Sequence, residues 1–383
     1  MVHADGLVAL AGTVRARQPQ DTWGVVAGRL PEYGITRVAD LTHLDCVGLP
    51  VWTAVRPTSL TLSTSQGKGA TDLLARLSAV MEAIELWHVE QPLSVTAYGP
   101  AAEVAPDCPL SALPMTVPYA PEVLARVVWE WTAGSGLLSG SPRLLPTALV
   151  QRREQRPPWS PDLLRATSTG LACGNTRDEA LLHALLEVVE RDVLYRDGLA
   201  GGRHRTLIAP GTVDDPHGQE IIGRLAAAGM SLEIALVDGP YGLPVCVAYL
   251  WSEDYPVVFA GGGCHTSANI ALTRAVAEAA QSRLTAIAGT RDDLPRERAD
   301  AIPPAFDTAG AARLAPWRQA TARLPPPPCG GFAEQVAAVA GRIAQVTGYE
   351  PVALDLSASH QPVAAVQVVC PGTRSRIRRS MPR

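Results

Sequence analysis

The 383-residue sequence lacks several patterns that identify common protein classes. Its seven cysteines are scattered, odd in number and never spaced C-x-x-C, which argues against a disulfide framework and against a zinc site. No run approaches the about 18 uninterrupted apolar residues of a membrane span, and no basic leader precedes an apolar core at the N-terminus. We therefore expect a cytoplasmic protein that does not contact a membrane.

Basic charge and the common nucleotide signatures are also scarce. The net charge of -4 leaves no strongly basic balance, so nucleic-acid binding is not expected. Lys68 is the only lysine among 33 basic residues. It is followed by Gly69, and Leu62 occupies the place of the first P-loop glycine, so no G-x-x-x-x-G-K-[ST] motif exists. Protein-kinase and dinucleotide-binding signatures are missing as well.

What the sequence does contain is an alternation of β-branched segments with long helical patterns, which predicts a mixed fold of the α/β (α+β) class. The expected strands cover residues 34–41, 51–55, 125–131, 231–237, 245–251 and 257–260. The expected long helices cover about 71–91, 177–196 and 269–288. Residues 100–165 are proline-rich with a polar linker at 152–160, and a helix-plus-strand unit is expected at about 331–370.

An internal repeat relates the three long helices. Residues 69–85 align on 174–190 without a gap at an offset of 105, and seven of the seventeen positions are identical. One helical unit therefore occurs three times. The third copy is thinner, with Ala271, Ala275, Glu278 and Gln281 at the same relative spacing and Arg274 where the others have Ser78 and His183.

Acidic side chains form a stripe on one face of each of the first two helices, at about 100° per residue. An E-x-x-E pair on one helix is usually a solvated face. Here the pattern is repeated, and the other positions are apolar almost all round, as in buried helices. The stripes consist of Ser78, Glu82 and Glu85 on the first helix and of Glu179, His183, Glu187 and Glu190 on the second.

Buried ionised carboxylates need compensating positive charge, and few lysines or arginines share these helices. Divalent cations would provide that charge. Oxygen ligands favour Mg²⁺, which completes its shell with water and substrate phosphates. We therefore expect the glutamates to converge on one polar cavity, close enough to share Mg²⁺ with a nucleoside triphosphate. Glycine-rich loops precede both helices and offer backbone N–H groups to phosphate or ribose, although an ordinary turn is the alternative.

Three segments resemble the signature blocks of the YcaO family. They read STSQGKGATDLLARLSAVMEAIELWH, STGLACGNTRDEALLHALLEVVERD and GGGCHTSANIALTRAVAEAAQSRLTAIAGTRDD. The resemblance covers about residues 35–370. It implies a single catalytic unit over 1–383, built from three helix-bearing units around a central site for ATP and Mg²⁺, with a basic tail at 371–383.

The resemblance also implies roles for individual residues. Arg191 and Arg274 would be catalytic, because they would offset charge on the phosphates, although a helix ion pair is the alternative for Arg191. The Cys264-His265 pair is expected to be structural. The implied metal ligands are Glu82, Glu85, Glu187 and Glu190. The implied nucleotide contacts are Lys68, Ser78, Asn175, Glu179, Arg191, Arg274, Gln281 and Arg283.

The family chemistry implied here activates a backbone amide of a ribosomally made peptide. A nucleophile adds to the carbonyl, the resulting oxyanion attacks the γ-phosphate, and loss of phosphate completes the exchange of oxygen. An internal Cys, Ser or Thr side chain gives an azoline, whereas external sulfide gives a thioamide.

Two features of the sequence indicate the branch of the family. Azoline-forming relatives commonly end in P-x-P-x-P, which this chain lacks, and residues 371–374 read P-G-T-R instead of P-G-L-E. The block GITRVADLTHLDCVGLPVW is most similar to relatives that work beside a TfuA-like protein. We therefore favour thioamide formation, with azoline formation as the alternative and a non-catalytic peptide-binding scaffold as a third reading.

The expected partners follow from the same resemblance. They are a peptide substrate and either a TfuA-like protein or a leader-peptide-binding protein, and such relatives are often homodimers. Five arginines in the last ten residues fit either a grip on an acidic peptide or a solvated tail.

Overall fold

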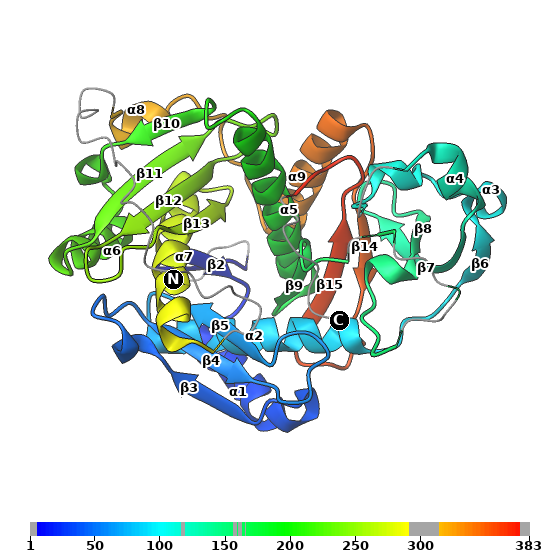
Figure 1. The fold of residues 1–383 in the computed structure, drawn as a ribbon, viewed down its shortest axis with the longest axis horizontal. Helices are drawn as coiled ribbons and strands as arrows, with labels where there is room; N and C mark the ends of the chain where they lie inside the picture. Colours follow the sequence, from blue (N-terminus) through cyan, green and yellow to red (C-terminus); the bar gives the residue numbers. More distant parts are fainter. Residues whose placement is uncertain are drawn as a thin grey trace.

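The computed structural model describes residues 6–115, 119–155, 159, 163–164, 166–290 and 314–375. Three sheets are arranged around the middle of the molecule (Figure 1). In each sheet, one strand leads into one of the three long helices. The predicted mixed α/β class is confirmed. No helix within the described ranges is long and apolar enough to cross a membrane.

The strands pair antiparallel within each sheet. A three-stranded sheet has the order β3 (Arg37–Asp40), β4 (Val51–Val55) and β5 (Thr64–Lys68). A four-stranded sheet has the order β10 (Arg205–Ile208), β11 (Ser231–Val237), β12 (Val245–Trp251) and β13 (Phe259–Cys264). A six-stranded sheet has the order β6 (Ala97–Pro100), β7 (Val128–Gly136), β14 (Val352–Asp355), β15 (Ala364–Val369) and β9 (Leu171–Gly174), with β8 (Pro142–Pro146) paired to β7. A separate hairpin consists of β1 (Val8–Leu10) and β2 (Thr13–Arg15).

The helices include three that are much longer than most of the others. These are α2 (Asp72–Glu90), α5 (Arg177–Leu199) and α7 (Ala268–Ala288), which overlap the ranges expected from the repeat. The other α-helices are α1 (Pro19–Val26), α3 (Ala101–Val104), α4 (Pro121–Arg126), α6 (Pro216–Ala227), α8 (Trp317–Thr321) and α9 (Phe332–Thr347). Short 3-10 helices are η1 (Ala27–Tyr33), η2 (Thr42–Leu44), η3 (Leu110–Ala112), η4 (Thr147–Leu149) and η5 (Pro210–Thr212).

Two of the predicted strands are partly wrong. The segment expected as a strand at 125–131 begins inside α4, because Pro121 occupies the first turn of a short helix, where its fixed φ and missing N–H are tolerated. The strand expected at 257–260 starts at Phe259 and continues through three glycines to Cys264. The expected linker at 152–160 and the basic tail lie partly outside the described residues.

Each sequence repeat is a strand followed by a long helix, and the helix packs on the sheet to which that strand belongs. α2 packs on β5 and β4, α5 on β9 and β15, and α7 on β13 and β12. The first two helices begin alike, because Thr71 accepts a hydrogen bond from the Leu74 N–H at 3.3 Å and Thr176 accepts one from the Glu179 N–H at 3.2 Å. The repeat is therefore a structural unit as well as a sequence pattern.

Alanines and glycines bring each helix close to the strand before it. A Cβ atom on Gly174 would lie 2.6 Å from the Ala180 nitrogen, and one on Gly263 would lie against the carbonyl oxygen of Ala271, well inside van der Waals contact. In Figure 1, α2, α5 and α7 approach one another beside the hairpin of β1 and β2.

Substituting Gly263 with alanine tests this close packing. The added methyl group must push β13 away from α7, and we expect the free energy of unfolding to fall by about 1–3 kcal/mol. Gly223 in α6 is the matched control, since nothing lies within 4 Å of the position that an added methyl group would take, and Gly223→Ala should stabilise the helix by about 0.5–1 kcal/mol. Urea unfolding curves of both variants measure the difference, and equal stability for the two would contradict the packing argument.

Candidate active site

One cavity of about 1460 Å³ lies among the three long helices and the N-terminal hairpin. Its walls bring together side chains from the N-terminal hairpin to the end of α7, which are far apart in the sequence. Of the residues assigned to a site from the sequence, those that line it are Lys68, Ser78, Glu82, Glu85, Asn175, Glu179, Glu187, Glu190, Arg191, Arg274 and Gln281. All four predicted metal ligands therefore line one cavity, and their sharing of Mg²⁺ stays a prediction.

Backbone N–H groups hold the glutamates in place. Each donor comes from the strand or turn that precedes a helix, and each bond uses only part of the acceptor capacity of a carboxylate. The carboxylates can therefore be fixed by the protein and still bind a cation. The bonds run from Gln66 to Glu82 at 3.1 Å, from Cys173 to Glu85 at 2.7 Å and from Gly170 to Glu187 at 3.2 Å.

Burial leaves these carboxylates short of compensating charge. Burial raises the pKa of Glu187 to about 7, and it raises the pKa of Glu190 although the nearby Arg191 opposes it. Burial also raises the pKa of Glu85 well above its ordinary value, and the charges of neighbouring glutamates add to the effect. Additional positive charge in the cavity would favour the ionised forms.

Two cations already contact part of the cluster. Arg191 lies 3.6 Å from a carboxylate oxygen of Glu187 and 3.6 Å from one of Glu190, and Lys68 lies 3.3 Å from Glu278. Burial alone would raise the pKa of Glu278, but Lys68 and Arg191 outweigh it and lower that pKa. The ion pairs proposed as the alternative for Arg191 are thus present, and they place its guanidinium within the cavity wall.

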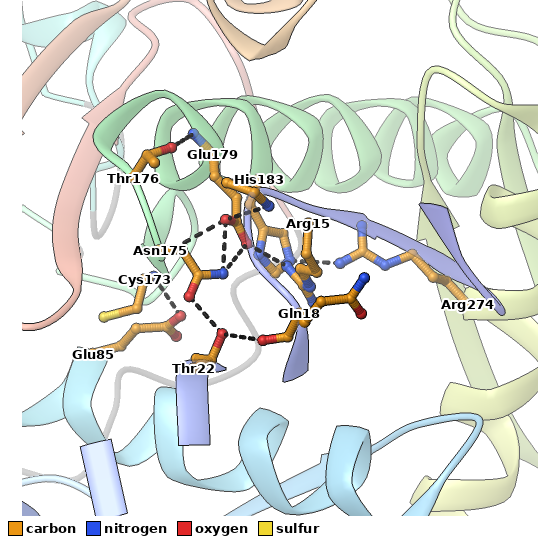
Figure 2. Close-up of polar contacts among 11 residues, drawn as sticks. Arg15, Gln18, Thr22, Glu85, Cys173, Asn175, Thr176, Glu179, His183 and Arg274 are labelled. Carbon is orange, nitrogen blue, oxygen red and sulfur yellow. Dashed lines mark hydrogen bonds and ion pairs between the residues drawn. The ribbon is translucent and has the colours of Figure 1, made fainter. Parts of the chain in front are cut away.

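Glu179 and Asn175 connect α5 to the N-terminal segment (Figure 2). Glu179 is 3% exposed and accepts hydrogen bonds from the Ala16 N–H at 3.0 Å and from the Asn175 N–H at 3.1 Å. The Asn175 side chain donates a further bond at 3.0 Å, and Arg15 lies 3.4 Å from the other oxygen. Thr22 donates to the Asn175 side-chain oxygen at 2.7 Å. Both residues line the cavity, and they also anchor the hairpin over it.

Arg283 is placed elsewhere. It lies nine residues after Arg274, which at about 100° per residue puts it on the opposite face of α7. Its guanidinium pairs with Asp45 at 3.0 Å and with Asp254 at 2.8 Å, and it does not line the cavity. Its placement gives no support to the predicted nucleotide contact.

Other residues line the cavity without having been assigned from the sequence. Glu278 occupies the repeat position of Glu82 and Glu187, so the repeat itself could have identified it. Arg15 and Arg17 come from the N-terminal segment, which shares no repeat with the helices, and only the fold brings them here.

The donor set suits Mg²⁺ in part. Its ligands would be hard carboxylate oxygens, as this ion prefers. Within the ranges that the structure describes, however, no group of three or more His, Cys, Asp or Glu side chains could hold a metal ion by itself. A Mg²⁺ ion held here by Glu82, Glu85, Glu187 or Glu190 would need further oxygens from water and phosphates, which is its usual coordination.

Comparison with known proteins shows the family of this chain. Residues 66–374 match the family described as YcaO cyclodehydratase, ATP- and Mg²⁺-binding. The chain belongs to the YcaO family. An uncharacterized protein of Mycobacterium tuberculosis is 37% identical over 376 residues, which span 94% of this chain and 82% of that protein. A Rhizobium leguminosarum protein described as lying in the tfuA 3' region is 34% identical over 383 residues, which span 94% of this chain and 88% of that protein.

Solved structures share the YcaO fold at low sequence identity. The YcaO of Methanopyrus kandleri bound with AMPPCP and Mg²⁺ matches with a TM-score of 0.70 and 22% identity, over 96% of this chain and 94% of that one. A heterocyclase in complex with substrate and cofactor matches with a TM-score of 0.70 and 22% identity, over 94% of this chain and 53% of that one. A chain of the E. coli microcin synthetase McbBCD complex with pro-MccB17 bound matches with a TM-score of 0.60 and 14% identity, over 87% of each chain. ATP and Mg²⁺ are the cofactors of the family to which this YcaO protein belongs.

Replacing Glu187 with glutamine should stabilise the protein in the absence of nucleotide and metal. The pKa of Glu187 is about 7 in the folded state, above its ordinary value of 4.5. The folded protein therefore loses stability as pH rises from about 4.5 through about 7, because the unfolded chain releases this proton more readily. We expect Glu187→Gln to be more stable than wild type by about 1–2 kcal/mol at pH 8, with the difference vanishing near pH 4.5. Urea unfolding at both pH values measures the difference. A destabilised variant at pH 8 would contradict the view that the charge of Glu187 is incompletely compensated.

Proposed function

We propose that this YcaO enzyme uses ATP and Mg²⁺ to activate a backbone amide of a ribosomally made peptide and exchanges the amide oxygen for sulfur. The observation that carries the proposal is the single cavity where glutamates from two long helices, Glu278 of the third and the cations Lys68, Arg191 and Arg274 meet. ATP would supply the phosphoryl group that takes up the amide oxygen, and Mg²⁺ would neutralise its phosphates.

The chain's own residues would position the reactants. Glu82, Glu85, Glu187 and Glu190 would hold the cation. Backbone N–H groups orient the carboxylates of the first three, and Arg191 lies beside Glu190. Arg191 and Arg274 would face the phosphates, where fixed positive charge stabilises charge that develops in the transition state.

One comparison supports a sulfur nucleophile over a side chain of the substrate. A relative that is 34% identical along nearly the whole chain is described as lying in the tfuA 3' region. We therefore propose a TfuA-like protein as the partner and external sulfide, or a donor of it, as the source of sulfur.

Azoline formation is the second candidate. The matching family is described as a cyclodehydratase family, and heterocyclases are among the proteins of the same fold. In that reaction a Cys, Ser or Thr side chain of the peptide would add to the preceding carbonyl, and water would be lost overall. Both reactions need the same amide activation, so the cavity by itself serves either.

The mass of the product separates the two reactions. The purified chain is incubated with ATP, Mg²⁺, sulfide, the peptide encoded beside its gene and any neighbouring TfuA-like protein. We expect phosphate release together with a peptide heavier by the difference between a sulfur and an oxygen atom, measured by mass spectrometry. A peptide lighter by one water without sulfide would establish the azoline reaction, and phosphate release with an unchanged peptide would contradict both.

The companion variant for this experiment is Glu190→Gln. Glu190 is 8% exposed in the cavity wall, and its amide replacement cannot supply a charged oxygen to Mg²⁺. We expect product formation to fall below detection while the melting temperature stays within a few degrees of wild type. Glu32→Gln, at an exposed ion pair with Arg29, is the matched control and should leave turnover unchanged. Normal turnover in Glu190→Gln would remove the metal role from this residue.

A further inference from the structure

The repeat brings two chemically different residues face to face. His183 on α5 and Arg274 on α7 occupy the same position of the repeated helix, and Ser78 occupies it on α2. In the cavity a terminal nitrogen of Arg274 lies 2.6 Å from Nε2 of His183 (Figure 2). Equivalent positions of two units therefore meet in the same cavity wall.

The contact determines the state of the histidine. A guanidinium can only donate hydrogen bonds, so Nε2 of His183 must be the accepting, unprotonated nitrogen. Burial and the charges of Arg274, Arg15, His265 and Lys68 all lower the pKa of His183 well below its ordinary value. His183 is thus a neutral imidazole with its proton on Nδ1.

Arg274 is oriented without being neutralised. Besides the bond to His183, its guanidinium donates to the carbonyl oxygen of Cys264 at 3.4 Å. Within the described residues, no carboxylate lies in ion-pair contact with Arg274, although Glu190 and Glu278 act on its pKa from a greater distance. Arg191, by contrast, already pairs with two glutamates at 3.6 Å each. Of these two arginines, Arg274 keeps more of its charge for a ligand.

We propose that His183 is a positioning residue that aims the Arg274 guanidinium at the phosphates of the nucleotide while leaving its positive charge uncompensated. The inference rests on the proposed function, which assigns Arg274 to the nucleotide phosphates. A neutral acceptor is essential to this role, because a carboxylate in the same place would orient Arg274 equally well and cancel its charge. His183 acts only through Arg274.

Three substitutions at one position separate orientation, charge and packing. His183→Gln keeps a neutral acceptor, His183→Leu removes the acceptor, and His183→Glu keeps the acceptor but adds a negative charge. The measured quantities are the dissociation constant for AMPPCP with Mg²⁺, by calorimetry, and the melting temperature. Binding is measured without peptide, so the result does not depend on which reaction follows.

We expect His183→Gln to bind AMPPCP within a few-fold of wild type and His183→Leu to bind it about tenfold more weakly, as for loss of one charge-assisted hydrogen bond. His183→Glu should lose at least as much affinity while its melting temperature stays at or above that of His183→Leu. A merely structural role predicts instead that His183→Glu binds AMPPCP more tightly than His183→Leu, because a glutamate bonded to Arg274 would preserve the contact between the helices.

The control is His88→Gln, which replaces a buried histidine on α2 that does not line the cavity. It should leave AMPPCP binding unchanged even if stability falls. Wild-type binding by His183→Glu, or equal losses in all three variants in step with their stability, would overturn the role of His183. If wild-type protein itself fails to bind AMPPCP with Mg²⁺, the proposed function falls, and this role falls with it.

Discussion

The central constraint on this structure is the burial of several carboxylates in the wall of a helix-lined cavity. Ionised carboxylates in such a place are costly unless hydrogen bonds and positive charge stabilise them. Backbone N–H groups of Gln66, Gly170 and Cys173 provide part of that stabilisation, and the raised pKa values of Glu187 and Glu190 show that it is incomplete. Positive charge brought into the cavity by a ligand would therefore favour the ionised carboxylates.

The arrangement of the cavity follows from a threefold use of one unit. In each unit a strand precedes a long helix, and in all three glycines or alanines let the helix lie close to a sheet. Because the units are similar, equivalent positions reach the same space, as Glu82, Glu187 and Glu278 do. The units have nonetheless diverged in chemistry. The position that holds Ser78 in one unit holds His183 and Arg274 in the others, and the last two form a contact that no single unit could make.

The N-terminal hairpin completes the cavity from outside the repeat. Arg15 and the backbone of Ala16 bond to Glu179, and Thr22 bonds to Asn175, so the beginning of α5 is joined to β2 and α1. These bonds occupy groups that the family resemblance assigns to the nucleotide. The same contacts bring two further cations, Arg15 and Arg17, to a cavity rich in carboxylates.

The sequence by itself determined the mixed fold class and the approximate extent of α2, α5 and α7, because helical periodicity and the repeat are local patterns. It also identified the acidic stripes, since the spacing of residues on a helix decides which side chains share a face. Only the tertiary structure decided which groups meet across units. Arg283 shares a helix with Arg274 but lies on the opposite face, where Asp45 and Asp254 hold it. The hydrogen bond between His183 and Arg274 joins residues 91 positions apart, and such contacts depend on how the sheets pack, which local patterns do not encode.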